Sequence, residues 1–269
     1  MTSFLVTGIG GPAGKNVAEL LLERKYRVVG TDMRYLEHPK IQVYQVPPAN
    51  ALDFLATIHR IASDEQVDLI IPTVSEELPV FARDWQRRAE IPILISSAQA
   101  VEIADDKYLT SKTLSTKGVN VPRFALPSHV HSIDAVARMV GLPCVSKPRV
   151  GRGGREVAIR TEKDWNEIAA LDDHYILQEF ASGTDYAPNV FVGSDGQSMV
   201  VTLEKTELKG GNVGNATKVQ RVIAPDVAEL AMAAARAVGL VGPLDIDIRR
   251  CSDGVPVVLE INARFGANI

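Results

Sequence analysis

Residues 257–266 read Val-Val-Leu-Glu-Ile-Asn-Ala-Arg-Phe-Gly, an apolar lead followed by Glu260, Asn262 and Arg264, which single apolar residues separate. Successive side chains of a β-strand point to opposite faces, so this pattern places the three polar groups on one face. A carboxylate and an amide offer oxygens to a hard cation such as Mg²⁺, and a guanidinium offers a rigid fork of donors to phosphate. An ordinary antiparallel strand with one wet face shows the same alternation, and this stretch alone does not separate the two interpretations.

A second strand pattern precedes this one. Residues 244–248 read Leu-Asp-Ile-Asp-Ile, which repeats the alternation and adds two carboxylates. The Ser-Asp-Gly sequence at 252–254 lies between the two runs and is typical of a hairpin turn. Such a hairpin would place Asp247 beside Glu260 and Asn262, which together form a candidate metal site.

The composition is that of an ordinary globular protein, with 269 residues, 46% hydrophobic and 23% charged. The net charge of −4 offers no electrostatic footprint for nucleic acid or an anionic membrane. No apolar run is long enough to cross a bilayer, and a predicted strand begins so early that no signal peptide is expected. Cys144 and Cys251 lie in apolar runs and are interpreted as buried thiols. We therefore expect a cytoplasmic protein without nucleic-acid or membrane partners.

The first hundred residues alternate between strand and helix patterns. Strands are expected at 4–6, 27–30, 41–46, 67–72 and 91–95, with helices at 17–22, 52–61 and 76–88. Continuous apolar strands separated by helices predict a parallel sheet covered on both faces, which is an α/β fold.

The pattern changes after this region. Helices are expected at 105–118, 132–140, 164–170 and 226–238, and strands at 144–147, 156–160, 175–178, 189–192, 199–203 and 217–223. Together with the final hairpin, these strands predict antiparallel sheets in an α+β arrangement.

A glycine-rich turn follows the first strand, since residues 7–14 read Thr-Gly-Ile-Gly-Gly-Pro-Ala-Gly and Asp32 ends the second strand. This pattern is typical of dinucleotide-binding sites. Tyr108 and Lys112 also have the spacing of the catalytic pair of short-chain dehydrogenases, so one hypothesis is an NAD(P)-dependent oxidoreductase. However, any tight strand-to-helix turn needs such glycines, and Tyr108 falls in the first turn of a helix. An oxidoreductase would also leave the polar groups of residues 244–264 without a role.

A second glycine-rich loop lies in the other half of the chain. Residues 146–155 read Ser-Lys-Pro-Arg-Val-Gly-Arg-Gly-Gly-Arg between two predicted strands. Lys147 can neutralise phosphate, and the glycines let backbone N–H groups fold over phosphate oxygens. Residues 176–185 then form an apolar strand that leads into a linker, which can offer backbone donors and acceptors to a purine, while Asp185 can accept from ribose hydroxyls.

In their order and spacing, these motifs resemble an ATP-grasp ligase, in particular the carbamoyl-phosphate-synthase-like proteins with a single module. The motifs are Asp106-Lys107 at a helix start, residues 118–122 after that helix, Lys147 with its glycine loop, residues 178–185, Asp247, and the Glu260-x-Asn262-x-Arg264 strand. The resemblance implies a Rossmann-like parallel-sheet domain at 1–104. An ATP-grasp module of two antiparallel-sheet subdomains follows, with a small lid at 105–174 and a large subdomain at 175–269 that is short at its C-terminus.

The resemblance also implies roles for individual residues. Lys107 and Lys147 contact ATP phosphates, the loop with Gly151, Gly153 and Gly154 closes over them, Gln178, Glu179, Phe180 and Ala181 surround adenine, and Asp185 binds ribose. Asp247, Glu260 and Asn262 bind one or two Mg²⁺ ions, for which Mn²⁺ can substitute. Arg264 and Lys147 act on the transferring phosphoryl group.

The implied function is an ATP- and Mg²⁺-dependent ligase, which phosphorylates a small carboxylate and couples the acyl phosphate to an amine or ammonia. Residues 209–215 are a second candidate lid, with Lys205, Lys209 or Lys218 near the acid, and Glu76 or Glu77 is a candidate for holding the amine. The protein would act as a homo-oligomer or with a subunit from a split gene. Besides the NAD(P) oxidoreductase, the alternative is a non-catalytic ATP-binding subunit of a split carbamoyl-phosphate-synthase-like enzyme.

Overall fold

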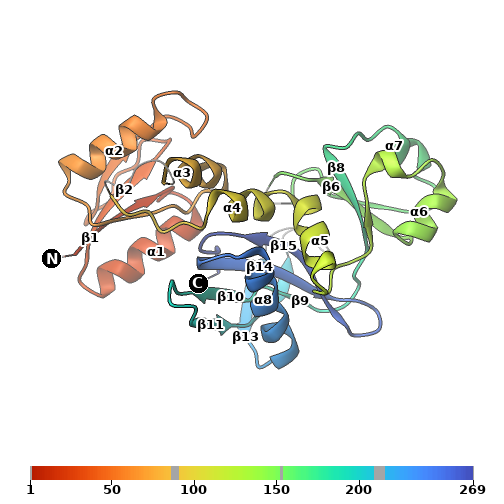
Figure 1. Ribbon diagram of the computed structural model, residues 1–269. Helices are drawn as coiled ribbons and strands as arrows, with labels where there is room; N and C mark the ends of the chain where they lie inside the picture. Colours follow the sequence, from red (N-terminus) through yellow and green to blue (C-terminus); the bar gives the residue numbers. More distant parts are fainter. Residues whose placement is uncertain (1, 86–90, 152–153, 209–215, 269) are drawn as a thin grey trace.

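The computed structural model of this chain describes residues 2–85, 91–151, 154–208 and 216–268, which form three β-sheets with helices packed around them (Figure 1). A parallel sheet comes first along the chain, and a small and then a large antiparallel sheet follow it. The predicted fold class, α/β followed by α+β, is confirmed by this order.

The parallel sheet has the strand order β3-β2-β1-β4 among the described residues. Its strands are β1 (Ser3–Thr7), β2 (Arg27–Asp32), β3 (Gln42–Gln45) and β4 (Leu69–Ile71), and its helices are α1 (Pro12–Glu23), α2 (Phe54–Asp64), the 3₁₀ turn η1 (Ser75–Glu77) and α3 (Leu78–Trp85). One face packs on α1 through Val6 and Val28, and the other packs on α2 and α3 through Leu5. On that second face the rings of Phe54 and Phe81 meet edge to face at 5.5 Å.

The prediction of a fifth strand at 91–95 is wrong. Ile93 forms only a single parallel bridge to Ile70, flanked by hydrogen bonds from Ile70 N to Pro92 O and from Leu94 N to Ile70 O, both of 2.9 Å. Pro92 has no N–H to extend a ladder, and the chain turns into a helix within a few residues.

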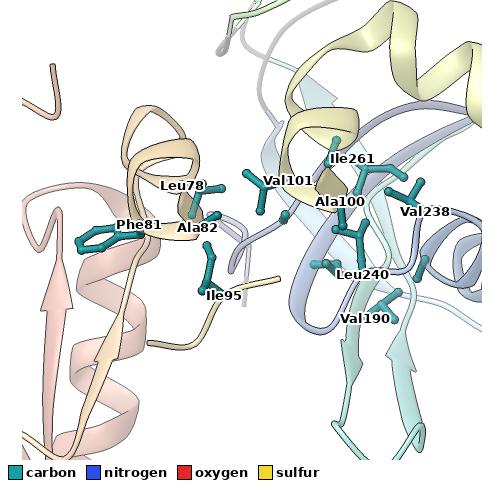
Figure 2. Packing of buried hydrophobic residues seen from close by; sticks show 14 of the residues in the cluster. Leu78, Phe81, Ala82, Ile95, Ala100, Val101, Val190, Val238, Leu240 and Ile261 are labelled. Carbon is teal, nitrogen blue, oxygen red and sulfur yellow. The ribbon is translucent and has the colours of Figure 1, made fainter. Parts of the chain in front are cut away.

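That helix, α4 (Ala98–Asp105), is missing from the sequence-based prediction, and α5 (Lys107–Thr116) follows it directly. The Ser97 side chain caps α4, and Asp106 caps α5. Figure 2 shows that buried side chains such as Leu78, Val101 and Ile261 form one apolar cluster that runs from α3 through α4 to the final strand. The α4 helix therefore packs the parallel-sheet region against the rest of the chain.

The small antiparallel sheet has the order β5-β8-β6-β7 in the described part of the chain. Its elements are β5 (Phe124–Ala125), the 3₁₀ turn η2 (Pro127–His129), α6 (Ile133–Met139), β6 (Cys144–Pro148), β7 (Ala158–Arg160), α7 (Trp165–Ala169) and β8 (Tyr175–Glu179). Val136, Cys144, Ile168 and Leu177 meet in its core, and Cys144 is a free buried thiol there, as predicted. Burial raises the pKa of this thiol to about 11, so it is an inert core group. The prediction that Cys251 is also buried is wrong, because this free thiol is half-buried at the end of β14 (Gly242–Arg250).

The large antiparallel sheet has the order β11-β10-β14-β9-β12-β13 among the described residues, with β15 paired to β14. Its elements are β9 (Asp185–Tyr186), β10 (Asn189–Val192), β11 (Ser198–Val201), β12 (Leu203–Leu208), β13 (Ala216–Arg221), α8 (Pro225–Val238), β14 (Gly242–Arg250) and β15 (Pro256–Asn262). The predicted hairpin is confirmed, with Asp247 opposite Glu260 and Asp245 opposite Asn262. Leu244, Ile246 and Ile248 are buried in the core on the other face of β14.

A bulge interrupts this hairpin between Asp247 and Ile248, because Asp247 pairs with Glu260 whereas Ile248 pairs with Val258. Leu259 is the extra residue, and its carbonyl oxygen accepts a hydrogen bond from Lys147 Nζ at 3.2 Å. The bulge therefore brings a lysine of the small sheet onto the large one. None of the helices in the described part of the chain has the length and apolar character that a membrane span requires.

Candidate functional site

A cavity of about 540 Å³ lies where the three sheets meet. Its lining includes thirteen predicted site residues, namely Lys107, Lys147, Gly151, Gly154, Gln178, Glu179, Phe180, Ala181, Asp185, Asp247, Glu260, Asn262 and Arg264. Gly153 and residues 209–215, with Lys209, lie outside the described residues. The structure thus gathers the predicted residues around one space, and their individual roles remain predictions.

Two of the three lysines that line the cavity, Lys107 and Lys147, come from different elements. Lys107, the first residue of α5, donates from Nζ to the Gly151 carbonyl oxygen at 2.9 Å and lies 3.4 Å from Glu260 Oε2. Lys147, on β6, is 8% exposed, and burial lowers the pKa of its ammonium group to about 8. An anionic ligand would favour the charged form of this buried ammonium group.

Asp247 and Glu260 lie opposite each other on the cavity face of the hairpin. Their environments shift the pKa values of the two carboxyls in opposite directions. Burial, together with the nearby charge of Glu260, raises the pKa of Asp247 to about 7 although Lys205 opposes it. Burial also disfavours the charged form of Glu260, but Lys107 and Lys147 outweigh it and lower the pKa of that carboxyl to about 2.

Lys205 on β12 sits between two of the predicted site carboxylates. Its ammonium group forms an ion pair with Asp247 and lies 3.3 Å from Asp185 Oδ1. Burial works against the charged lysine, but the two carboxylates prevail and raise its pKa above the ordinary value. The sequence predicts Lys205 only as a neighbour of the acid substrate, because nothing in its short strand signals that the sheet order brings β12 beside β9.

Asp185 Oδ1 is buried and has no hydrogen-bond partner among the described residues, since its contact with Lys205 lacks hydrogen-bond geometry. A buried carboxylate oxygen without a donor is costly. A ligand hydroxyl at this position would supply the donor, which fits the predicted contact with ribose.

At the predicted adenine end, the polar side chains already have protein partners. Gln178 donates from its amide to Ser111 Oγ at 3.0 Å, and Glu179 forms an ion pair with Arg123 at 3.0 Å. The Arg249 guanidinium lies over the Phe180 ring, 5.6 Å from its centroid. The backbone N–H groups of Glu179 and Phe180 also donate within the protein, to Arg123 O at 2.8 Å and Pro143 O at 3.4 Å. The contact of Glu179 and Ala181 with adenine through their backbones stays a prediction.

Arg264 connects the final strand to the parallel-sheet region. Its Nε donates to Ser75 Oγ at 3.0 Å, and one terminal nitrogen donates to Asn262 Oδ1 at 3.3 Å. Neither Glu76 nor Glu77 is among the residues lining the cavity. Glu77 instead turns into the core and accepts a hydrogen bond from the Thr7 hydroxyl.

Asp32, the acidic residue of the dinucleotide-like pattern, already has hydrogen-bond partners in the protein. Asp32 accepts hydrogen bonds from the backbone nitrogens of Gly10 at 2.9 Å and Arg34 at 3.0 Å. Gly8 and Gly11 nevertheless line the cavity. The glycine turn therefore forms part of the cavity wall. Lys218, a candidate neighbour of the acid substrate, is exposed and pairs with Glu207 at 3.5 Å instead.

The predicted donor set for a metal consists of oxygens on adjacent strands, from Asp247, Glu260 and Asn262. The described residues contain no group of three or more His, Cys, Asp or Glu side chains arranged to hold a metal by themselves. Two carboxylates and an amide suit Mg²⁺ that is shared with phosphate oxygens and water, because this ion seldom occupies a site built from protein alone. The residues therefore fit a metal that arrives with a nucleotide.

Comparisons with known sequences match most of this chain. The family model of the ATP-grasp domain matches residues 104–268. The probable alpha-L-glutamate ligase of Parasynechococcus marenigrum (strain WH8102) is 27% identical over 217 residues, which are 75% of this chain and 45% of that protein. The probable alpha-L-glutamate ligase of Coxiella burnetii (strain Dugway 5J108-111) is 26% identical over 224 residues, covering 78% of this chain and 73% of that protein.

The fold also matches solved structures. The biotin carboxylase domain of the Hydrogenobacter thermophilus 2-oxoglutarate carboxylase, solved with MgADP, ADP and bicarbonate, superposes with a TM-score of 0.73 at 15% identity. This match covers 99% of the present chain and 65% of the other. The present chain thus spans less than half of the first relative and about two thirds of this structure.

Proposed function

The chain belongs to the ATP-grasp family, and on this premise we propose that it is an ATP- and Mg²⁺-dependent ligase that joins a carboxylate to an amine or ammonia. The observation that carries the proposal is the meeting of Lys107 and Lys147 with Asp247 and Glu260 around one cavity. Cations that bind phosphate and carboxylates that bind a metal are the two components that phosphoryl transfer requires.

In the proposed first step, an oxygen of the substrate carboxylate attacks the γ-phosphorus of ATP, the bond to the bridging oxygen breaks, and ADP leaves. Lys107 and Lys147 would neutralise the charge on the phosphate oxygens, because both ammonium groups line the cavity. Arg264 would stabilise the transferring phosphoryl group and the acyl phosphate, since its guanidinium lines the cavity between β15 and Ser75 of η1.

In the second step, the amine nitrogen attacks the acyl carbon, the carbon–oxygen bond to phosphate breaks, and the amine releases a proton. Acyl phosphates hydrolyse readily, so the site must exclude water during this step. Gly151 and Gly154 lie at the cavity wall where a covering loop would be needed.

Asp247, Glu260 and Asn262 would hold Mg²⁺, which supplies charge neutralisation and orientation to the phosphates when bound. Two ions, and replacement by Mn²⁺, are part of this proposal, because the carboxylates of Asp247 and Glu260 and the amide of Asn262 would offer several oxygen ligands on adjacent strands. The small-molecule substrates are a carboxylic acid and an amine, and the chain acts as a homo-oligomer or with a partner subunit. Free Cys144 and Cys251 support a reducing compartment, the cytoplasm.

Isothermal titration with ADP and Mg²⁺, followed by assays of ADP release with panels of amino acids and amines, tests the proposal. We expect Mg²⁺-dependent nucleotide binding and ADP release that requires both an acid and an amine. No nucleotide binding would overturn the proposal, and binding without turnover for any acid would favour the non-catalytic subunit. A fluorescence titration with NADPH should show no binding, because Asp32 is occupied by its own loop.

A further inference from the structure

Arg149 lies two residues beyond Lys147, and its side chain pairs with Asp106, the residue before Lys107. It is not among the residues lining the cavity. Its Nε lies 3.1 Å from both carboxylate oxygens of Asp106, and a terminal nitrogen donates to Asp106 Oδ2 at 2.6 Å. The other terminal nitrogen donates to the Asp173 carbonyl oxygen at 3.0 Å, and the guanidinium lies 5.2 Å from the centre of the Tyr108 ring.

Both polar groups of the Arg149 backbone also form hydrogen bonds. Its N–H donates to the His174 carbonyl oxygen at 2.8 Å, and its own carbonyl oxygen accepts from the backbone N–H of Lys107 at 2.9 Å. Lys107 Nζ donates to Gly151, two residues further on. Lys107 is therefore tied to the segment after Lys147 by both its backbone and its side chain.

Asp106 has two separate tasks in this arrangement. Its Oδ1 caps α5 by accepting from the backbone nitrogens of Tyr108 at 2.8 Å and Leu109 at 3.1 Å. The same carboxylate forms the bidentate pair with Arg149; the side chains of Asp106 and Arg149 are 13% and 26% exposed, so the pair is partly shielded from water. Since α5 packs against β15, which carries Glu260, the pair fixes the end of β6 relative to the large sheet.

We propose that Arg149, through Asp106, is a positioning residue that holds Lys107 and Lys147 at a fixed separation before the nucleotide binds. This inference rests on the proposed function, in which both lysines contact phosphate. Losing the pair would let the two ammonium groups drift apart, and each would then meet the phosphates at a poorer distance. The competing explanation is that the pair only stabilises the fold.

Three variants separate these explanations. Arg149→Lys keeps the charge but cannot form the bidentate fork. Asp106→Asn keeps a good helix cap but removes the negative charge. The matched control is Arg250→Lys, because Arg250 forms a similar bidentate pair with Asp226 at 2.7 and 3.0 Å, stacks over Tyr186, and does not line the cavity.

The measurements are the dissociation constant of MgADP, KM for ATP and for the acceptor acid, and the thermal unfolding midpoint. We expect Arg149→Lys and Asp106→Asn each to weaken MgADP binding and raise KM for ATP by roughly 10- to 100-fold, with KM for the acid unchanged. The double variant should be no worse than the poorer single one. Arg250→Lys should lower the thermal unfolding midpoint by about as much as Arg149→Lys does, while leaving nucleotide binding intact.

The inference is overturned if folded Arg149→Lys and Asp106→Asn bind MgADP as the wild type does, or if Arg250→Lys loses as much affinity. If one of the two variants fails to fold, the other decides. Absence of MgADP binding to the wild-type protein would overturn the proposed function as well, whereas normal wild-type binding with unaffected variants would overturn this inference alone.

Discussion

Lys107 Nζ lies 3.4 Å from Glu260 Oε2, so a predicted phosphate ligand and a predicted metal ligand form an ion pair across the cavity. Each group compensates the charge of the other while no ligand is bound, and burial makes this compensation necessary. When a nucleotide and Mg²⁺ bind together, the phosphates can take over Lys107 and the metal can take over Glu260. Binding of the two ligands should therefore be strongly coupled.

We predict that Glu260→Gln abolishes the Mg²⁺ dependence of ADP binding but not ADP binding itself. The variant loses a charged metal ligand and leaves Lys107 and Lys147 less compensated, so Mg²⁺-free ADP should bind at least as well as before. ADP release in turnover should fall by about 100-fold or more, since metal stabilisation is worth several kcal/mol. Titration with and without Mg²⁺ measures this, with the exposed Glu229→Gln as the control. Retained Mg²⁺ dependence would contradict the metal assignment.

Nucleotide affinity should fall as the pH rises above about 8. Burial lowers the pKa of Lys147 to about 8, so its ammonium group is charged below that pH and neutral above it in the free protein. Each further pH unit should cost up to about tenfold in affinity for MgADP. Lys147→Arg keeps its charge throughout and should flatten the profile. An unchanged affinity up to about pH 9.5 in the wild type would show that Lys147 does not contact phosphate.

The hairpin and its polar face could be predicted from sequence because both depend on local rules. The two-residue period of a strand fixes the shared face of Glu260, Asn262 and Arg264, and the turn at 252–254 fixes the pairing with Asp247. The site residues that the order of motifs predicts line one cavity wherever the structure describes them.

Most of the features that the sequence does not predict depend on contacts between distant residues. Lys205 meets Asp185 and Asp247 only because β9 lies between β14 and β12 in the sheet, and no local pattern encodes that order. Asp32 has the position of a ribose ligand, but its partner is the backbone of Gly10. The α4 helix is the exception, because its signal is local: Ser97 caps a run of good helix formers.

Glu77→Gln should stabilise the protein, most strongly above pH 7. Burial raises the pKa of the Glu77 carboxyl from 4.5 to about 7, against the hydrogen bond from Thr7. Between these values the unfolded chain is ionised and the folded chain is not, so the free energy of unfolding falls as the pH rises. Above pH 7 the loss amounts to roughly 3 kcal/mol, which glutamine avoids while still accepting from Thr7.

Urea unfolding at about pH 4 and pH 8.5 tests this sign. The gain from glutamine should vanish at the lower pH, where both states of the wild type hold the proton. Glu23→Gln, at an exposed glutamate of the same region, should change little at either pH. A less stable Glu77→Gln at pH 8.5 would mean that the ionised carboxylate has a partner that the burial argument omits.

Asp185→Ala should remove the ability to distinguish ATP from 2′,3′-dideoxy-ATP. The buried Asp185 Oδ1 has no hydrogen-bond partner among the described residues, and a ribose hydroxyl would donate to it. We expect the wild type to bind ATP more tightly than the dideoxy analogue by roughly tenfold, the worth of a hydrogen bond to a charged group. In Asp185→Ala the two should bind alike. Because Lys205 keeps Asp247 as a partner, the variant should still fold, and preserved discrimination would place the ribose elsewhere in the cavity.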